Sequence, residues 1–305
     1  MDLIQLRCFV AVAEELHFGK AARRLDMLPS ALGRQIRLLE SSAGMPLLVR
    51  TTRNVALSPD GAALLDEVRA LLAQAEALER RFHERGRRQA RVLRIGAIDT
   101  AAAGLVPDLL HDFRKRRTGL RAGVTVQIVE DKTARLLPRI LSGRLDLAFV
   151  RPPERPDKRI EFLKLFHETP VVALPSRHRL ARRSRLTVAT LVGQPLIVPD
   201  RSSRPHSHDL TMKLFERAGL KPTISQVAEE KQTIVNLVAA KLGLAFVPRW
   251  ASRFAVSGVC FVPLAPEDLK LLPLAAAWLR GSRDPLRDEM LAVLRLHLQR
   301  YARKA

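Results

Sequence analysis

Cysteine, aromatic residues and long hydrophobic runs are all scarce in this 305-residue sequence. The two cysteines, Cys8 and Cys260, are too few for a disulfide framework or a four-thiolate zinc site. Aromatic residues make up 5%, which argues against stacking platforms for single-stranded nucleic acid. No uncharged apolar stretch approaches the roughly 18 residues of a membrane span, so we expect no membrane partner. Met1 to Gln5 lack the basic start of a secretory signal, so we expect a cytoplasmic protein.

Acidic residues are also few, with 31 Asp and Glu against 52 Lys and Arg, and the net charge is +21 at pH 7. Such an excess suits a polyanionic partner such as nucleic acid. It is unevenly distributed, because residues 1–91 carry a net charge of +4 and residues 92–305 carry +17. We interpret the larger excess as a compositional habit of the source, with a second basic surface that touches bent DNA as the alternative.

The first forty residues predict three short helices. Residues 2–16 place apolar side chains at helical spacing, residues 18–25 form a second helix, and a third begins at Pro29. This third helix turns polar side chains outward: Arg34, Gln35 and Arg37. Two helices joined by a tight turn, with Arg and Gln outward on the second, predict a helix-turn-helix that reads the major groove of double-stranded DNA. A plain three-helix bundle is the alternative on spacing alone.

A hairpin and a long helix follow. Residues 45–57 are typical of two short strands around a polar tip, which we interpret as a wing against phosphates or the minor groove; a solvated turn is the alternative. Ser58 and Pro59 then begin a helix as its N-cap and first residue. Its apolar residues alternate spacings of four and three: Leu64, Val68, Leu71, Ala75, Leu78 and Phe82. We expect nothing in this region to cover that seam, so we predict a dimerisation helix rather than one packed on its own domain.

From residue 92 onward, strand-like and helix-like segments alternate. We predict strands at 92–98, 125–129, 145–150, 170–175, 195–198, 223–227, 244–247 and 272–279, and helices at 106–116, 134–141, 210–218, 232–240 and 285–302. This alternation predicts mostly parallel sheets in two α/β lobes, with a ligand cleft between them. Loops at the strand ends would line the cleft, namely 98–100, 131–133, 150–153 and 201–205. Their hydroxyl groups, Arg151 and helix N-terminal amides suit a carboxylate.

Catalytic and cofactor motifs are missing from the sequence. It has no G-x-S-x-G, G-x-x-x-x-G-K-[ST], G-x-G-x-x-G or H-E-x-x-H pattern. His206, His208 and Asp209 lack a matching cluster elsewhere, so we expect no metal site, no cofactor and no enzyme. A metal-dependent hydrolase that uses the His206 cluster is the rival hypothesis.

Residues 6–15, 18–25 and 31–40 together resemble the LysR-type transcriptional regulators, and the resemblance covers essentially the whole chain. Residues 44–48 with Arg50 and Arg53 look like the family's wing, and residues 57–61 look like the start of its linker helix. The resemblance implies an α + α/β fold. It comprises an N-terminal winged helix-turn-helix (1–58), a long linker dimerisation helix (59–90) and a two-lobed periplasmic-binding-protein-like effector domain (91–305; lobe I 91–162 and 266–305, lobe II 163–265). It also implies a homodimer or homotetramer that binds promoter DNA.

The sequence departs from the family at the start of the recognition helix. The family usually has Ser-Gln-Pro-Ala-Leu-Ser there, with the Gln and the last Ser touching DNA, whereas this chain has Leu28-Pro29-Ser30-Ala31-Leu32-Gly33. A bidentate base contact is worth roughly 1–3 kcal/mol, so losing one changes sequence preference without abolishing phosphate-driven binding. Arg34 becomes the main candidate for base contact. The predicted DNA-binding residues are Ser30, Gly33, Arg34, Gln35, Arg37, Arg50, Thr51 and Arg53.

Residues 143–151 look closest to the subgroup that controls degradation of aromatic acids. Thr100, Thr133 and Arg151 match positions where that subgroup holds effector carboxylates, whereas Ser207 stands where the subgroup carries an aromatic residue. Asp99 adds a negative charge that an anion avoids unless Arg151 or Lys132 offsets it. The predicted effector-binding residues are Thr100, Thr133, Arg151, Pro205 and Ser207, for an aromatic or dicarboxylic acid.

The predicted function is therefore a sequence-specific, DNA-binding transcriptional regulator whose promoter binding is modulated by a small effector. A cytoplasmic solute-binding module without a DNA role is the alternative. The helix-turn-helix argues against that alternative, and a gel shift with the protein's own upstream DNA discriminates between the two.

Overall fold

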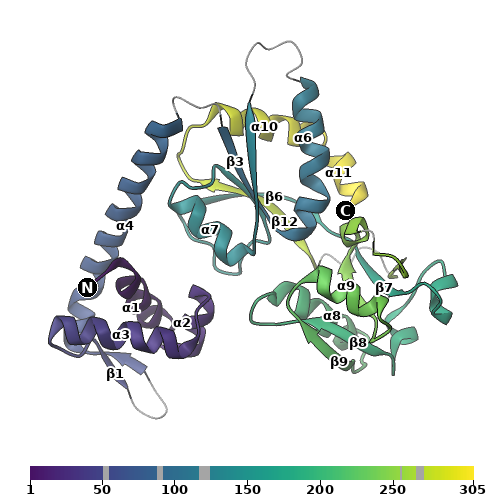
Figure 1. Cartoon of the computed structure of the whole chain (residues 1–305), viewed down its shortest axis with the longest axis horizontal. Helices are drawn as coiled ribbons and strands as arrows, with labels where there is room; N and C mark the ends of the chain where they lie inside the picture. The colour runs from purple at the N-terminus through teal and green to yellow at the C-terminus, as the bar shows by residue number, and fades with distance from the viewer. Residues whose placement is uncertain (51–54, 88–91, 117–123, 255, 266–270) are drawn as a thin grey trace. The chain divides into compact units, whose positions relative to one another are not determined.

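The computed structural model describes residues 1–50, 55–87, 92–116, 124–254, 256–265 and 271–305. The chain forms two compact units (Figure 1). The first comprises Met1–Ala90 with Leu141–Arg144, and the second comprises Arg91–Ile140 with Leu145–Ala305. Among the described residues, no helix is long and apolar enough to cross a membrane.

The first unit begins with three helices, α1 (Leu3–Glu15), α2 (Phe18–Leu25) and α3 (Pro29–Ala43). Asp2 starts α1 through a capping box, in which its carboxylate accepts from the Gln5 backbone N–H at 2.8 Å. The apolar faces of the three helices enclose one core, as predicted. The side chains wholly or almost wholly buried there include Phe9, Val12, Ala21, Ala22, Leu32, Ile36 and Leu39.

A short hairpin and a long helix complete this unit. Strands β1 (Leu48–Arg50) and β2 (Val55–Leu57) pair antiparallel, and α4 (Pro59–Arg87) follows them. The hydroxyl of Ser58 accepts from the Gly61 backbone N–H at 2.9 Å, which confirms Ser58 as the cap of α4.

The expectation of an uncovered seam on α4 is wrong for its first turns. Leu64 and Val68 pack against the core of the first unit, because α4 lies against α1 and buries them there. Leu71 is 42% exposed and Leu78 is 54% exposed, so the uncovered apolar surface is confined to later turns of the helix. The side chain of Phe82 lies outside the described residues.

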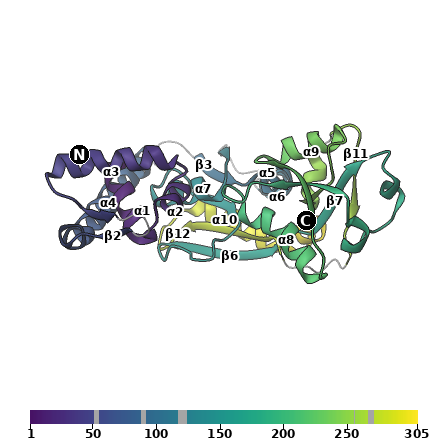
Figure 2. The same ribbon diagram turned by 90° about the horizontal axis from the view of Figure 1, so that it is seen from below.

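The second unit contains a mixed five-stranded sheet with the order β4-β3-β5-β12-β6, the sheet of lobe I. Strands β3 (Val92–Ala97), β4 (Thr125–Glu130) and β5 (Leu147–Val150) are parallel to one another. Strand β12 (Pro273–Leu279) is antiparallel to β5 and to β6 (Ile160–His167), which lies beside it in both views (Figures 1 and 2). The helices of this lobe are α5 (Asp99–Ala103), α6 (Leu105–Arg116), α7 (Thr133–Leu141), α10 (Pro285–Leu296) and α11 (Leu298–Lys304).

The rest of the second unit is built on two smaller sheets. We use lobe I for the five-stranded sheet with its helices and lobe II for these two sheets with theirs. Strand β7 (Pro170–Pro175) pairs antiparallel with β10 (Ala245–Pro248) and with β11 (Val259–Pro263). Strands β8 (Pro195–Pro199) and β9 (Thr223–Ala228) form a parallel pair. Two helices pack on these strands, α8 (Pro205–Arg217) and α9 (Lys231–Ala239).

Three sequence predictions need correction in the second unit. Strands β6 and β11 were not predicted, and the sheets are not mostly parallel. The five-stranded sheet is mixed, the β10-β7-β11 sheet is antiparallel, and the β8-β9 pair is parallel. In lobe I the mixing is due to β12, which runs antiparallel to both of its neighbours, β5 and β6. The predicted helix 285–302 is two helices, because the backbone leaves helical geometry at His297.

Candidate functional site

The candidate DNA-reading surface is the outer face of α3. Leu32 and Ile36 fix the helix in the core, which leaves the opposite face toward solvent. Ser30, Arg34 and Arg37 are exposed on that face, and Gln35 is half-buried. These four predicted residues therefore lie on or beside one accessible surface.

The start of α3 is apolar and lacks a side-chain cap. Leu28 occupies the N-cap position without a side-chain hydrogen bond, and its side chain is 72% exposed. Gly33 is buried and, being a glycine, offers no side chain to DNA, although it was a predicted contact residue. A Cβ built at Gly33 would meet only the Arg37 guanidinium, at 3.9 Å, so space for a side chain exists there.

The predicted wing is described only in its strands. Leu48 pairs with Leu57 and Arg50 with Val55 in a two-stranded sheet, as expected for a hairpin. Thr51, Arg53 and the side chain of Arg50 lie outside the described residues, so their DNA contacts remain predictions.

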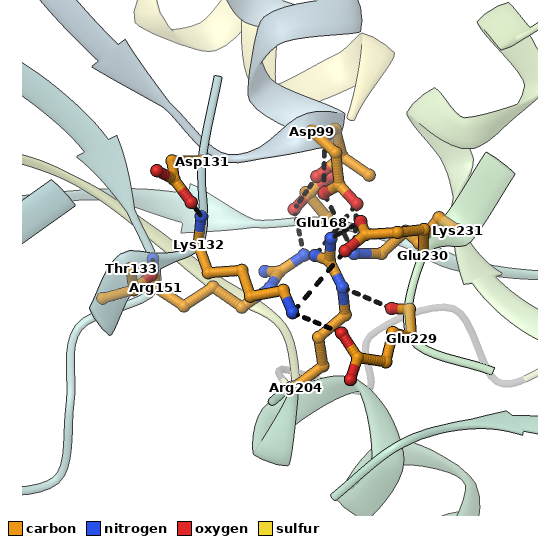
Figure 3. Close-up of polar contacts among 11 residues, drawn as sticks. Asp99, Asp131, Lys132, Thr133, Arg151, Glu168, Arg204, Glu229, Glu230 and Lys231 are labelled. Carbon is orange, nitrogen blue, oxygen red and sulfur yellow. Dashed lines mark hydrogen bonds and ion pairs between the residues drawn. The ribbon is translucent and has the colours of Figure 1, made fainter. Parts of the chain in front are cut away.

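The second unit brings a cluster of charged side chains together (Figure 3). In lobe I, Asp99 follows β3, Lys132 and Thr133 follow β4, and Arg151 follows β5. The carboxyl ends of these parallel strands meet at one edge of the sheet, where α/β proteins bind ligands. From lobe II, Arg204 precedes α8 and Lys231 begins α9. The loops predicted to converge do converge.

Arg151 and Glu168 form a buried ion pair in this cluster. Nη2 of Arg151 donates to Oε2 of Glu168 at 2.5 Å, and the hydroxyl of Thr100 donates to the same oxygen at 3.2 Å. Arg151 also donates to the carbonyl oxygen of Pro273 at 3.2 Å, and its backbone N–H donates to the hydroxyl of Thr133 at 3.3 Å. The other carboxylate oxygen, Oε1 of Glu168, is buried without a hydrogen-bond partner within the described residues. Arg151 and the Thr100 hydroxyl therefore already bind a carboxylate of the chain itself, that of Glu168.

A second buried group centres on Asp99. Its Oδ2 lies 2.9 Å from Nζ of Lys231 and 3.0 Å from Nη1 of Arg204, both from lobe II. Burial by itself would raise the pKa of Asp99, but Lys231 and Arg204 outweigh it and hold the pKa at about 2. Burial lowers the pKa of the Lys231 ammonium, because the charged form loses its hydration.

The remaining cation of the cluster has more exposed partners. Nζ of Lys132 lies 2.7 Å from Glu229 and 3.6 Å from Glu230, whose side chains are 61% and 51% exposed. Arg204 also pairs with Glu230, and its Nε donates to the carbonyl oxygen of Glu229 at 2.6 Å. The four cations of the cluster, Lys132, Arg151, Arg204 and Lys231, thus face four carboxylates, Asp99, Glu168, Glu229 and Glu230.

This arrangement corrects one expectation and adds residues that the sequence did not reveal. Arg151 or Lys132 was expected to offset Asp99, but Lys231 and Arg204 do so. The run Glu229-Glu230-Lys231 before an apolar helix could have signalled part of the cluster, whereas Glu168 stands in no motif. Thr100 and Ser207 are buried, Thr133 is half-buried and Pro205 is exposed at the start of α8.

A helix-turn-helix unit and an α/β unit with a polar cluster at its strand ends define a DNA-binding regulator with a ligand-binding domain. The family models agree. The bacterial regulatory helix-turn-helix protein, lysR family, matches residues 3–62, and the LysR substrate binding domain matches residues 86–299. The chain belongs to the LysR family of DNA-binding transcriptional regulators, and it is not an enzyme.

Individual relatives are consistent with this assignment. The chain is 56% identical to the HTH-type transcriptional regulator TtuA of Agrobacterium vitis, with 100% of both chains covered. It is 33% identical to the Hca operon transcriptional activator HcaR of Escherichia coli (strain K12), with 98% of each covered. The crystal structure of full-length BenM matches with a TM-score of 0.57 and 27% identity, covering 100% of this chain and 98% of that one.

Proposed function

We propose that this regulator binds promoter DNA through α3 and the wing, and that a small carboxylate bound at the charged cluster modulates that binding. The observation that carries the effector part is the convergence of four cations and two Thr hydroxyl groups at the strand ends of lobe I. Charge-assisted hydrogen bonds from such groups are the usual way to hold a carboxylate. The proposed contacts are Thr100, Thr133, Arg151, Pro205 and Ser207, joined by Lys132.

Lys132 is the cation that a carboxylate reaches at least cost. Glu229 and Glu230 are 61% and 51% exposed, so either carboxylate can turn into solvent, and an incoming carboxylate then restores the charge balance of Lys132, which is only 15% exposed. Glu168 and Asp99 are buried and cannot leave Arg151 or Lys231 without a large desolvation cost. The effector carboxylate therefore replaces Glu229 at Lys132, and Arg151 with its Glu168 partner shapes the neighbouring wall.

The effector test compares matched lysine variants of the full-length protein. Succinate and benzoate, titrated in a thermal-shift assay, represent a dicarboxylic and an aromatic acid. The active acid is expected to raise the melting temperature of the wild type and of Lys221→Ala, in which an exposed lysine of lobe II outside the cluster is removed. With Lys132→Ala, at least a tenfold higher concentration of the acid should be needed for the same rise in melting temperature. Equal responses of the two variants would contradict the assignment of Lys132.

The oligomer is proposed to form through the uncovered turns of α4. Leu71 and Leu78 lie seven residues apart on one face and are both exposed, which suits the seam of a helix pair. A homodimer through α4 places two recognition helices on one duplex, and a homotetramer requires a further contact. Sedimentation of Leu71→Lys/Leu78→Lys is expected to show a smaller species than the wild type. An unchanged sedimentation coefficient would contradict this seam.

DNA binding is tested with the duplex upstream of the protein's own gene and with random duplex. Arg34→Ala is expected to narrow the difference between the two affinities, because a base contact carries the specificity. Arg53→Ala is expected to weaken both affinities alike, because a phosphate contact carries none. Equal losses on both duplexes for both variants would count against these roles. No shift with either duplex would contradict the DNA-binding proposal as a whole.

A further inference from the structure

The first turn of the recognition helix presents an apolar tip, which consists of Leu28 and Pro29. The Leu28 side chain is 72% exposed, more than any other large apolar side chain in the described part of the chain except Met1. Pro29 is also exposed and is the first residue of α3. Ser30 and Arg34 follow on the same accessible side of the helix. The tip therefore stands where a helix-turn-helix meets base edges, since the N-terminal residues of the recognition helix make those contacts.

Neither the core of the first unit nor the cap of α3 accounts for a leucine at position 28. The core receives Leu32, Ile36 and Leu39 from α3, and Leu28 is outside it. Its carbonyl oxygen accepts from the Leu32 N–H at 3.0 Å, whereas its side chain belongs to no apolar cluster among the described residues. As an N-cap, Leu is a poor choice, since it supplies no acceptor for the free N–H groups of the first turn. An apolar residue that stabilises neither the core nor the cap is suited to a contact outside the unit.

The chemistry of the tip restricts what it can recognise on DNA. Leu28 has no side-chain donor or acceptor, and Pro29 lacks even a backbone N–H, so neither side chain reads a hydrogen-bonding pattern or holds a phosphate. The apolar group on the major-groove edges of the four bases is the C5 methyl of thymine. We propose that the Leu28–Pro29 tip recognises thymine methyl groups in the operator, and that Leu28 is a specificity-determining residue; this inference rests on the proposed binding of promoter DNA through α3.

The tip works beside polar readers on the same helix. Arg34 and Arg37 are exposed further along α3 and are free to meet guanine edges and phosphates. A thymine methyl contact next to an Arg contact defines a base step by shape as well as by hydrogen bonds. The absence of a Gly33 side chain enlarges the share of specificity that the tip supplies.

The experiment begins with the full-length protein and a pool of random duplexes, from which binding sequences are selected separately with wild type and with Leu28→Ala. Ala caps a helix as poorly as Leu, so the variant is expected to fold like the wild type. Leu38→Ala is the matched control, because Leu38 is 45% exposed on α3 but lies away from its first turn. Wild type and Leu38→Ala should select a thymine at one position of each half-site, and Leu28→Ala should select any base there.

The second measurement replaces each selected thymine by deoxyuridine, which removes only the methyl group. Wild-type affinity is expected to fall about threefold to tenfold at the position that the tip reads, as for loss of one buried methyl contact. Leu28→Ala should bind the two duplexes alike. Where Leu28→Ala fails to fold, Leu28→Ser, whose hydroxyl can cap α3, replaces it in both measurements.

Two outcomes would overturn the proposal. One is a wild-type affinity that is insensitive to deoxyuridine at every position. The other is the same selected sequence and the same deoxyuridine response in Leu28→Ala as in the wild type, which would assign the methyl contact to another residue. A wild type that binds no duplex at all would instead contradict the DNA-binding proposal on which this one rests.

Discussion

The carboxylate of Glu168 accepts a 2.5 Å hydrogen bond from the guanidinium of Arg151, and both side chains are buried. Glu168 lies between β6 and β7, where the chain passes from lobe I to lobe II. Its backbone N–H donates to the carbonyl oxygen of Leu272 at 2.9 Å, and Leu272 immediately precedes β12. Arg151 binds the next carbonyl, that of Pro273. The pair therefore links the end of β5 to both connections between the lobes.

Breaking this pair should destabilise the second unit strongly. Arg151→Leu leaves a buried carboxylate without its cation, and Glu168→Gln leaves a buried guanidinium without its anion, so each is expected to cost about 3–5 kcal/mol. Both tryptophans, Trp250 and Trp278, lie in the second unit, so urea unfolding followed by tryptophan fluorescence reports on it selectively. If Arg151→Leu unfolds at the same urea concentration as the wild type, the ion pair does not stabilise the second unit as expected.

The second unit should lose stability in acid through Asp99. Its folded pKa of about 2 lies below the ordinary value near 4, so its contribution is complete above about pH 4 and disappears as the pH falls toward 2. The contribution is of the order of 2 kcal/mol. Asp99→Asn should therefore show a shallower decline in tryptophan-monitored stability over this range than the wild type. Parallel declines in the two proteins would show that other carboxylates account for the acid sensitivity.

Two helical glycines of the first unit should respond oppositely to alanine. Gly33→Ala is expected to stabilise α3 by about 0.5–1 kcal/mol, because the added methyl meets only the flexible Arg37 and the backbone loses less entropy on folding. Gly61→Ala is expected to destabilise the unit by about 1–3 kcal/mol, because its methyl would overlap the backbone carbonyl oxygen of Leu47. Hydrogen exchange of the α1 and α3 amides in the full-length variants measures both effects. Changes of the same sign would contradict this packing.

Leu28→Ser should strengthen the start of α3. A Ser hydroxyl at the N-cap can accept a hydrogen bond from a free N–H of the first turn, which Leu28 cannot do, and such a cap is worth about 1 kcal/mol. Slower hydrogen exchange at Ser30 and Ala31, whose N–H groups such a hydroxyl can reach, would verify it in the full-length variant. Leu28→Ala serves as the control without a cap, and equal exchange in the two variants would contradict the capping argument.

Local signals in the sequence predicted the elements around the DNA-reading helix. Pro29 and the Ser58–Pro59 pair mark where α3 and α4 begin, and both helices begin there. Strand β6 escaped prediction because an edge strand is only half-buried and shows no clean alternation. The burial of Leu64 and Val68 against the first unit was not predicted, because a heptad pattern is the same whether α1 or a second chain packs on it.

The sequence predicted where the loops of the charged cluster meet, but it did not predict which side chains form ion pairs there. The loops after β3, β4 and β5 could be brought together in advance, since parallel strands end at one edge of a sheet. Which cation meets which carboxylate could not be foreseen. Asp99 and Lys231 are 132 residues apart, and Glu168 follows a strand that the sequence did not reveal.

The sequence by itself determined the helix-turn-helix, the apolar start of its recognition helix and the family, because these depend on residue types at short, fixed spacings. Only the tertiary structure decided the charge balance of the charged cluster and how much of the α4 seam remains uncovered. Coulomb interactions and burial act between groups that are close in space, and that proximity is set by how distant strands and helices pack.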